Sequence, residues 1–402
     1  MLSVAAARQA IAKSLRPFAS EDVSLANACR RILRQDVMAE RDQPPFDRVT
    51  MDGIALRHAE LAAGRREFVI AGTQHAGDKV MTLPAATHCI EVMTGAVLPD
   101  GTDCVVPVER LTSNGKTISV EKDYQAGLRQ FIHPRASDHV AGTTLLSAGR
   151  RISAIDVALL ASAGLAKVKV TRQPVVRIIS TGNELVPAGE PIEPHQIRLS
   201  NGPALVAMLQ TLGFSDSAQL HLPDEPATLS KSIGAELANG DVLVLSGGVS
   251  MGKADFVPQV LAELGVEQVF HKISQRPGKP MWFGKGPQGQ AVFALPGNPV
   301  SALVCCRHYV LPALLEASGM PPLRAMNAIL TDDYHFAPPL TCFLPVRLLP
   351  EPDGRLHARP VLTNTSGDFT ALADSDGYLE LAAGETDFAA GSVQPLYLWE
   401  HV

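Results

Sequence analysis

Apolar residues near the start of the chain recur at the spacing of an α-helix. Four of them lie three or four positions apart and would share one side of a helix: Val4, Ala7, Ile11 and Leu15. The same spacing returns after Gly142, over residues 154–163. These two segments predict one mixed N-terminal domain built from residues 1–44 and 141–173.

Between these segments the pattern changes to short strands separated by turns. Stretches rich in apolar and β-branched residues alternate with glycine, proline and Asp-Gly pairs at 68–70, 89–93, 104–108 and 117–120. We therefore predict a small β-rich domain over residues 45–140, inserted into the N-terminal domain.

Strands and helices alternate with unusual regularity over residues 174–325. Five apolar stretches are strand candidates: 175–180, 217–222, 241–246, 266–273 and 291–295. The helices between them begin with capping residues or proline, namely Ser200 or Asn201 before Pro203, Pro226, and Asn298-Pro299. This alternation is typical of a parallel α/β sheet covered by helices on both faces.

The last segment, residues 326–402, loses the helical spacing and is rich in proline, glycine and short strands. It predicts a small C-terminal all-β domain. The predicted fold class is therefore an α/β multidomain protein, in which a central parallel α/β domain is joined by the mixed N-terminal domain, its β insertion and the all-β domain. A chain of 402 residues has room for several such units.

Composition narrows the range of partners. A formal net charge of −6 and the lack of basic runs argue against binding to nucleic acid. No stretch approaches the ~20 apolar residues of a membrane span and the start does not read as a secretory signal, so we expect a cytoplasmic protein without membrane association. The six cysteines lack CxxC spacing and are expected to be buried thiols, and the twelve histidines form no zinc motif.

Polar and glycine- or proline-containing segments follow the predicted strands. These segments are 181–184, 223–225, 247–252, 276–280 and 296–299. In open parallel sheets, ligands bind outside the carboxyl ends of the strands. Each glycine or proline taken singly could simply turn the chain, but five such segments together predict a binding site.

The chemistry of these segments favours an oxyanion as the ligand. Glycine lets backbone N–H groups approach an anion closely, and the starts of helices attract negative charge. Three basic residues on one of the loops would add fixed positive charge: Lys272, Arg276 and Lys279. The sequence therefore predicts a site for phosphate or a similar oxyanion.

Three carboxylates lie among the same segments: Glu184, Asp224 and Asp255. They would repel a phosphate unless a divalent cation bridged the two, and hard oxygen ligands suit Mg²⁺. We therefore predict a metal-assisted phosphate site with these three acids as the metal ligands. Asp224 and Asp255 could instead cap helices, which is a common role of aspartate before a helix.

Six separated motifs resemble one known family. In chain order they are Pro45-Phe46-Asp47-Arg48-Val49-Thr50-Met51-Asp52-Gly53, Met93-Thr94-Gly95-Ala96, Ser180-Thr181-Gly182-Asn183-Glu184-Leu185, Ser246-Gly247-Gly248-Val249-Ser250-Met251-Gly252, Pro277-Gly278-Lys279-Pro280 and Leu295-Pro296-Gly297-Asn298-Pro299-Val300. With Ser366-Gly367-Asp368 near the end, the chain resembles, over essentially its whole length, the MoeA and gephyrin E-domain molybdenum insertases.

The resemblance implies an elongated subunit of four domains and a homodimer, in which the β insertion of one subunit faces the α/β domain of the other. It implies the activity of a molybdopterin molybdotransferase, with molybdate and adenylated molybdopterin as substrates, Mg²⁺ as cofactor, and molybdenum cofactor and AMP as products. The adenylyltransferase of the preceding step and the recipient molybdoenzymes are further implied partners.

The resemblance also implies site residues. The catalytic candidates are Asp52, Thr94, Asp138, Glu184, Asp224, Asp255, Lys272 and Lys279. The candidates for holding the adenylated pterin and molybdate are Thr181, Gly182, Ser246, Gly247, Gly248, Ser250, Gly252, Arg276, Pro277, Gly278, Pro296, Gly297, Asn298 and Pro299. Asp52 could instead be a turn residue, because Met-Asp-Gly is good turn chemistry.

Two positions depart from the family pattern. The family's Arg-x-x-Gly-x-Asp reads His133-Pro134-Arg135-Ala136-Ser137-Asp138 here, so one positive charge is expected to be absent or displaced to Arg135. Ile54 stands where the family commonly has tyrosine, which removes a hydroxyl and an aromatic face. Both changes bear on substrate binding at the insertion.

Two other functions remain open. A molybdopterin adenylyltransferase would resemble residues 174–320 alone and would need neither Met51-Asp52-Gly53 nor Thr94-Gly95-Ala96. A non-catalytic pterin-binding or scaffold paralogue would keep the fold and lose turnover. A generic nucleotide hydrolase is disfavoured, because the chain has no GxxxxGK(S/T) loop.

Overall fold

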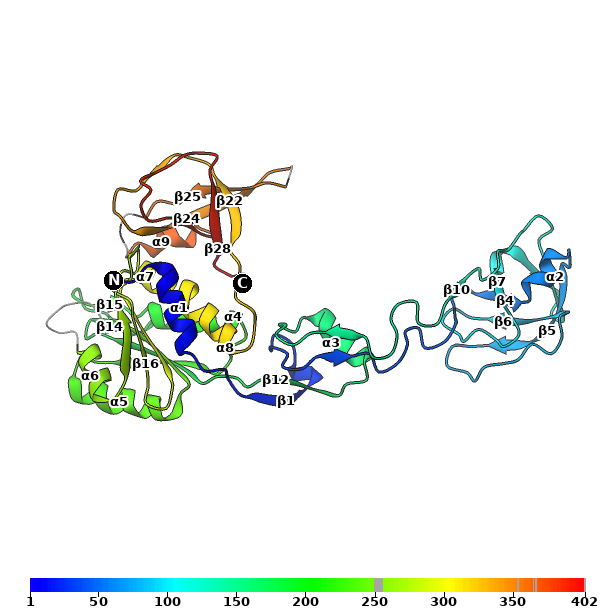
Figure 1. Cartoon of the computed structure of the whole chain (residues 1–402), viewed down its shortest axis with the longest axis horizontal. Helices are drawn as coiled ribbons and strands as arrows, with labels where there is room; N and C mark the ends of the chain where they lie inside the picture. Colours follow the sequence, from blue (N-terminus) through cyan, green and yellow to red (C-terminus); the bar gives the residue numbers. More distant parts are fainter. Residues whose placement is uncertain (249–255, 353, 364, 366, 401–402) are drawn as a thin grey trace. The chain divides into compact units, whose positions relative to one another are not determined.

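The chain forms two compact units (Figure 1). The computed structural model describes residues 1–248, 256–352, 354–363, 365 and 367–400. What we call the large unit contains Met1–Gln35, Ala148–Ala154 and Lys167–Val402, and the insertion unit contains Asp36–Ser147 and Ile155–Ala166. The finer division into four domains stays a prediction.

The large unit is built around a six-stranded sheet with the order β16-β13-β17-β21-β20-β18. Four neighbouring strands run parallel: β16 (Ser217–Leu222), β13 (Val176–Thr181), β17 (Val242–Ser246) and β21 (Ala291–Leu295). The fifth predicted strand is present as β18 (Glu267–His271). The sequence analysis missed β20 (Trp282–Lys285), a short strand with a central glycine that pairs antiparallel with both β18 and β21. The sheet is therefore mixed at this side rather than wholly parallel.

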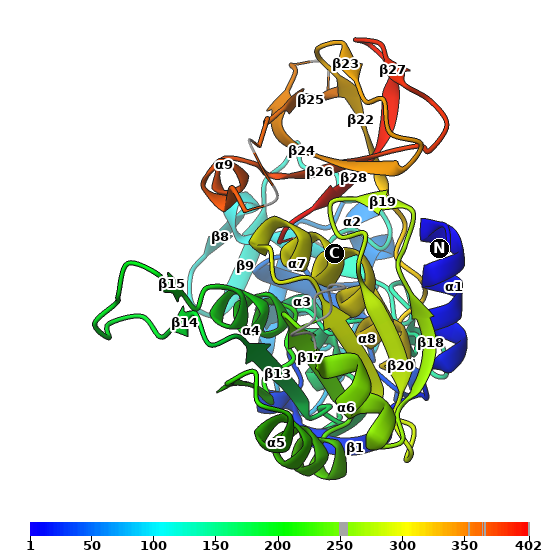
Figure 2. The same cartoon turned by 90° about the vertical axis from the view of Figure 1, so that its left-hand side faces the viewer.

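Helices cover both faces of this sheet (Figure 2). Along β17, Val242 and Val244 enter one core cluster while Leu243 and Leu245 enter the other, because successive side chains of a strand point to opposite faces. The first cluster includes residues of α1 (Val4–Ser14), α4 (Asn201–Thr211), α7 (Pro299–Cys305) and α8 (Leu311–Ala317). The second includes residues of α5 (Pro226–Asn239) and α6 (Val257–Glu263).

One long helical run crosses the core of the large unit. It consists of α7, a π-helical turn η3 (Cys306–Val310) and α8. By length and composition the run Pro299–Ala317 could cross a membrane, but 89% of its apolar window is buried inside the protein. Such burial is that of a core helix.

The N-terminal helix packs on the same core. α1 begins after Ser3, whose Oγ accepts a hydrogen bond from the N–H of Ala6 at 3.2 Å. Its buried residues Val4, Ala7 and Ile11 belong to the cluster of the central sheet, which confirms the predicted apolar side of this helix.

Short elements follow α1 along the chain. Two strand pairs are formed, β1 (Ser20–Ser24) with β12 (Lys167–Thr171) and β2 (Val37–Met38) with β11 (Thr144–Leu146). The remaining elements are the turn η1 (Leu25–Asn27) and the helix α3 (Ala154–Ser162).

The insertion unit contains a second six-stranded sheet, in the order β7-β4-β6-β5-β9-β8. All four predicted strands are present, as β5 (Glu67–Gln74), β6 (His88–Val92), β7 (Cys104–Pro107) and β9 (Thr117–Val120). The elements not predicted are β4 (Gly53–Leu56), α2 (His58–Ala62), η2 (Val108–Arg110) and β8 (Leu111–Ser113). A separate pair, β3 (Arg48–Val49) with β10 (Ile132–His133), adjoins them in sequence.

The C-terminal part is a sheet that closes on itself. Five strands take the order β24-β25-β22-β28-β26, and β26 pairs again with β24. They are β22 (Met326–Leu330), β24 (Thr341–Pro350), β25 (Leu356–Pro360), β26 (Gly377–Leu381) and β28 (Val393–Leu398). The other elements are β23 (Tyr334–His335) paired with β27 (Asp387–Phe388), and one short helix, α9 (Phe369–Ala373). A further strand from the α/β region, β19 (Gln275–Arg276), adds to β24.

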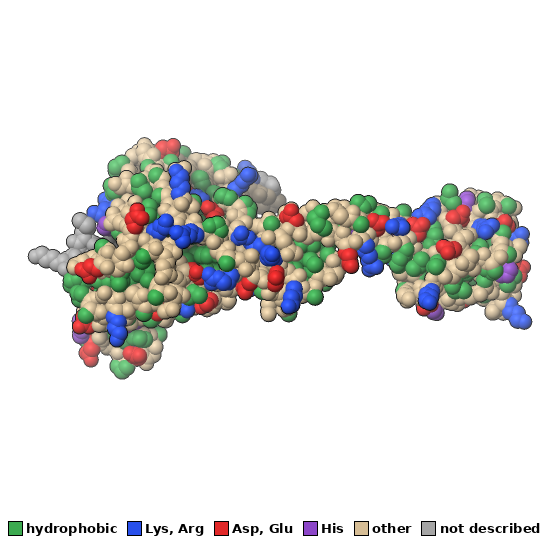
Figure 3. Space-filling view, turned by 60° about the horizontal axis from the view of Figure 1, so that its bottom comes forward, with side chains coloured by type: hydrophobic (Ala, Val, Ile, Leu, Met, Phe, Trp, Pro, Cys, Tyr) green, Lys and Arg blue, Asp and Glu red, His purple; other side chains and the backbone are tan. Residues whose placement is uncertain are grey.

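Surface chemistry is mixed over the described part of the chain. Acidic and basic side chains are interspersed with apolar ones on the face shown in Figure 3. Five cysteines are buried as predicted, but Cys29 is exposed because it lies in the turn that follows η1.

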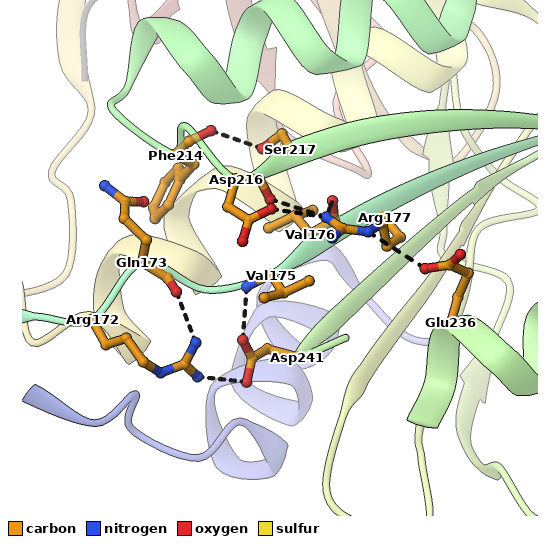
Figure 4. A network of polar contacts seen from close by, with 10 residues as sticks. All are labelled: Arg172, Gln173, Val175, Val176, Arg177, Phe214, Asp216, Ser217, Glu236 and Asp241. Atoms are coloured by element: carbon orange, nitrogen blue, oxygen red, sulfur yellow. Dashed lines mark hydrogen bonds and ion pairs between the residues drawn. The ribbon is translucent and has the colours of Figure 1, made fainter. Parts of the chain in front are cut away.

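A network of polar contacts anchors the amino ends of the central strands (Figure 4). Asp241, which precedes β17, accepts a hydrogen bond from the N–H of Val175 and another from the Arg172 guanidinium, both at 2.7 Å. Arg177 pairs with Asp216 at 3.1 Å and with Glu236 at 3.4 Å. These contacts link β13 to β16, β17 and α5.

Replacing Asp241 should weaken this end of the sheet. We expect Asp241→Ala to lower the free energy of unfolding by about 1–3 kcal/mol, since a partly buried N–H and a guanidinium lose their acceptor. Asp216→Ala is the matched control, because its carboxylate is 48% exposed and an exposed ion pair contributes about 0–1 kcal/mol. Urea unfolding measures both losses, and equal losses would contradict the assigned role of Asp241.

Candidate functional site

Three of the predicted loops meet at the carboxyl edge of the central sheet. A Cβ added to Gly247 would lie 2.6 Å from the carbonyl oxygen of Thr181, and one added to Gly297 would lie 3.7 Å from the Cα of Gly247. Gly247 also has a φ of +101°, which favours glycine. The backbones that follow β13, β17 and β21 therefore pack against one another at the carboxyl ends of these parallel strands.

Asn201 joins two of these loops. Its Nδ2 donates to the Oγ of Ser246 at 2.9 Å and to the carbonyl oxygen of Gly297 at 2.7 Å. The sequence analysis considered Asn201 only as a helix cap. In the structure Ser200 holds the cap position without a side-chain capping bond, and Asn201 instead fixes the polar edge of the sheet.

Several buried polar atoms at this edge lack a partner within the described residues. Neither the Oγ of Ser180, the Oγ1 of Thr181 nor the Oδ1 of Asn201 makes a hydrogen bond there. Buried polar atoms nearly always have a partner, so each such atom calls for an explanation. A polar ligand seated at this edge would supply the missing contacts.

Two of the predicted acids lie on neighbouring loops of the same edge. The carboxylate of Glu184 folds over Gly182, where an added Cβ would lie 2.7 Å from Oε2. The N–H of Asp224 donates to the Oδ1 of Asn183 at 3.1 Å, which ties the two acidic loops together. The loop of Glu184 continues into a small parallel pair, β14 (Leu185–Val186) and β15 (Ile197–Arg198).

The predicted metal triad is only partly described. Asp255, together with Ser250 and Gly252, lies outside the described residues. Among the described residues, no group of three or more His, Cys, Asp or Glu side chains could hold a metal ion. Glu184 and Asp224 are thus the two described members of the proposed triad.

A cavity of about 560 Å³ lies next to the loop that carries the basic residues. From the α/β region it is lined by Gln275, Arg276, Pro277, Gly278, Lys279, Pro280, Pro296, Asn298, Val300 and Ser301. From the C-terminal part it is lined by Tyr334 to Pro338, Leu340, Cys342 to Pro345, Val361 to Thr363 and Thr365. The two regions meet here because β19 adds to β24 in parallel.

A buried network supports the wall of this cavity. The Nε2 of Gln275 donates to the carbonyl oxygen of Pro277 at 3.0 Å, and Tyr309 donates its hydroxyl to the Oε1 of Gln275. A Cβ added to Gly278 would lie 2.4 Å from the Sγ of Cys305, and Gly278 has a φ of +89°. The loop therefore requires glycine at this position, and Lys279 is presented to the cavity by a fixed backbone.

The three predicted basic residues differ in position. Arg276 and Lys279 line the cavity, and both are exposed. Lys272 lies on the same loop but does not line the cavity, since its N–H donates to the carbonyl oxygen of Met281 at 2.9 Å and its φ of +74° turns the chain there.

The insertion unit holds the remaining predicted acids. The Oδ1 of Asp52 accepts hydrogen bonds from the N–H and from the hydroxyl of Thr94, both at 2.7 Å. These two bonds, the backbone one first, lower the pKa of Asp52. The predicted pair of Asp52 and Thr94 is therefore brought together with the carboxylate in its charged form at neutral pH.

Asp138 is held by a chain of side chains. The Nε2 of His133 lies 2.9 Å from the Oδ1 of Asp138, and its Nδ1 lies 3.0 Å from a guanidinium nitrogen of Arg48. Since arginine only donates, Nδ1 accepts and the His133 proton resides on Nε2, facing Asp138. The Arg135 guanidinium pairs with Asp42 at 2.8 Å. That the family's positive charge is absent here or displaced to Arg135 stays a prediction.

The second departure from the family pattern lies in the core. Ile54 is fully buried in β4 within the main apolar cluster of the insertion sheet. The side chain of Ile54 therefore packs the core of the insertion sheet.

Sequence reasoning missed the contribution of the C-terminal part to the cavity. The residues concerned include Tyr334, His335, Phe336, Thr363 and Thr365. The only signal was the Ser366-Gly367-Asp368 motif, which closely follows Thr363 and Thr365 in sequence. Its Ser366 lies outside the described residues.

The fold and the cavity define a multidomain α/β protein with a cavity lined by Arg276 and Lys279 beside the carboxyl edge of its sheet. Family models match three successive segments: the MoeA N-terminal region (domain I and II) at residues 2–164, a probable molybdopterin binding domain at 177–316 and the MoeA C-terminal region (domain IV) at 327–399. The chain belongs to the MoeA family, as its motifs predicted.

Individual relatives match over nearly the whole length. The chain is 38% identical over 400 residues to a molybdopterin molybdenumtransferase of Synechocystis sp., covering 99% of this chain and 100% of that protein. It is 32% identical to one of Bacillus subtilis, covering 95% of this chain and 90% of that protein. A crystal structure of the molybdopterin biosynthesis moeA protein from Pyrococcus horikosii aligns with a TM-score of 0.82 at 30% identity and covers 100% of both chains.

Ala136 offers a test of the altered segment 133–138. Its φ of +62° is costly for a residue with a Cβ, by about 1–2 kcal/mol, and the family has glycine there. We expect Ala136→Gly to raise the free energy of unfolding of the insertion unit by about 0.5–1 kcal/mol, after glycine's entropy cost. Urea unfolding checks this, and Ala141→Gly on the same loop is the control, which should bring no gain because Ala141 does not have a positive φ.

Proposed function

We propose that this chain is a molybdenum insertase, which transfers molybdate into adenylated molybdopterin and releases AMP. The observation that carries the proposal is the cavity of about 560 Å³ lined by Arg276 and Lys279, in a chain of the MoeA family. Both reactants are anions, so their approach to one another is unfavourable unless fixed positive charge and backbone N–H groups surround them.

The described residues supply positioning and charge. Arg276 presents a planar fork of donors suited to two oxygens of an oxyanion, and Lys279 supplies a point charge. Asn298 and Ser301 line the same cavity with polar side chains, and Thr363 and Thr365 do so from the C-terminal part. Holding two reactants in a fixed geometry and stabilising their charge accounts for most of the rate in such a site.

We further propose that Glu184, Asp224 and Asp255 hold Mg²⁺. The fit rests on two observations: Glu184 and Asp224 are carboxylates on adjoining loops, and Ser180, Thr181 and Asn201 nearby carry buried polar atoms without partners in the described part of the chain. Mg²⁺ commonly uses one or two protein carboxylates and completes its shell with water and phosphate oxygens. When bound, it would neutralise phosphate charge.

Asp52, Thr94 and Asp138 are proposed to act from the insertion unit. Thr94 holds the Asp52 carboxylate by two hydrogen bonds, and His133 orients Asp138 through its Nε2–H. Both carboxylates are thereby fixed in position, which suits a role in orienting a substrate.

A homodimer in the cytoplasm, with the adenylyltransferase and recipient molybdoenzymes as partners, completes the proposal. A dimer would let the insertion of one subunit serve the α/β site of the other. Sedimentation of the purified chain is expected to give twice its mass of 42.8 kDa. A monomer at micromolar concentration would reject this part of the proposal.

The activity is tested by AMP release from adenylated molybdopterin in the presence of molybdate and Mg²⁺. We expect the unaltered protein to release AMP, and Glu184→Ala and Lys279→Ala each to slow release by about 100-fold, the size of effect seen when one charge-stabilising group is removed. Glu184 and Lys279 are exposed, so neither change should unfold the protein.

Matched controls and the alternatives share this assay. Glu190→Ala and Lys231→Ala remove the same charges at exposed positions away from the cavity lining and should leave release unchanged. A scaffold paralogue would bind adenylated molybdopterin and release no AMP. An adenylyltransferase would form adenylated molybdopterin from ATP and molybdopterin, so that activity is measured in parallel.

A further inference from the structure

A second basic cavity lies in the large unit, and none of the described residues that line it also lines the first. Its volume is about 230 Å³. Its polar walls come from α1, η3, the segment before β22, and β28: Arg8, Arg307, His308, Arg324 and Tyr397. We call it the arginine cavity.

Positive charge dominates this cavity. Three guanidinium groups line it, no carboxylate of the described residues does, and arginine keeps its proton at any physiological pH. Within the described residues, neither Arg8 nor Arg324 forms an ion pair with a carboxylate. The nearby acid is Glu380 on β26, whose Oε2 lies 3.9 Å from the Nε2 of His308. Among the described residues that line the cavity, guanidinium groups therefore outnumber carboxylates.

Two of the polar residues are deeply buried. Arg307 is 4% exposed and donates its Nε–H to the carbonyl oxygen of Leu398 at 2.5 Å. Burial lowers the pKa of Arg307, and the neighbouring Arg8 lowers it further. A buried guanidinium close to another is costly, because lost hydration and like-charge repulsion add. The guanidinium groups that line the cavity would attract an anion placed in it.

His308 lies beside the cavity with its side chain fully buried. It is 1% exposed, and its Nδ1 lies 3.1 Å from the hydroxyl of Tyr378. Its Nε2 finds no hydrogen-bond partner among the described residues. When the Tyr378 hydroxyl donates to Nδ1, the proton of His308 resides on Nε2, which lies 3.9 Å from the Oε2 of Glu380 and is shielded from the cavity.

The helix itself is altered at this point. Arg307 and His308 lie in η3, the π-helical turn between α7 and α8. Such turns are rare and occur frequently at functional sites. The rest of the run is a buried apolar helix, so packing alone does not require an arginine and a histidine here.

We propose that the arginine cavity binds a small tetrahedral dianion, the chemistry shared by phosphate, sulfate and molybdate. Guanidinium forks of Arg8, Arg307 and Arg324 would contact its oxygens, which is the geometry arginine favours with oxyanions. A volume of about 230 Å³ is below the ~300–1,000 Å³ of sites for larger organic ligands, which favours a simple ion over a nucleotide. The site is independent of the proposed reaction.

Calorimetric titration with sodium phosphate tests the proposal. The full chain carrying Arg276→Ala and Lys279→Ala serves as background, so that the larger cavity does not compete for the anion. In this background we expect a phosphate site, and Arg8→Ala combined with Arg324→Ala should weaken its binding at least about tenfold, because two charge-assisted contacts are lost. Arg359→Ala, an exposed arginine on β25, is the matched control and should change nothing.

Sulfate and molybdate are titrated in the same way to identify the ion. Binding of any one of the three that is lost in the Arg8→Ala and Arg324→Ala protein supports the proposal. Binding that is equal with and without these two arginines, or no binding of any of the three, overturns it. Circular dichroism of the variants checks the fold, and Arg8 and Arg324 are not buried, so folding should survive.

Discussion

Burial of the central sheet on both faces is the constraint on which the rest of the structure depends. Every residue of β17 and β21 is buried, and their side chains alternate between two separate cores. Polar groups that serve a ligand can therefore stand only where these strands end. The parallel direction of β13, β17 and β21 then brings three strand ends to one edge, and glycine allows the following loops to touch.

The larger cavity depends on a second, local arrangement. The loop after β18 leaves the α/β region and contributes β19 to the closed C-terminal sheet. The side chain of Gln275 fixes this loop, because it donates a hydrogen bond to the carbonyl oxygen of Pro277 and accepts one from the hydroxyl of Tyr309. As a result, Lys279 and Arg276 face a wall that another part of the chain provides. Tyr309 belongs to the π-helical turn η3, which also contributes Arg307 and His308 to the lining of the arginine cavity.

The insertion unit shows how a changed motif can keep its geometry. His133 stands where the family has arginine. Its imidazole ring accepts a hydrogen bond from Arg48 and donates one to Asp138, and so links the two side chains. Ala136 keeps the left-handed backbone that glycine usually supplies, with a φ of +62°. Neither compensation is visible in the residue pattern, because Arg48 and His133 are 85 positions apart.

The sequence by itself determined the class of fold and the strand ends that carry chemistry, because apolar spacing and glycine placement are local properties of the chain. It placed the five main strands, the apolar side of α1 and the loops at Thr181, Gly247 and Gly297. Only the tertiary structure decided that β20 enters the sheet, that Asn201 bonds across two loops, and that the C-terminal part and the three arginines of the second cavity come together. Those features are contacts between distant segments, and no local pattern encodes them.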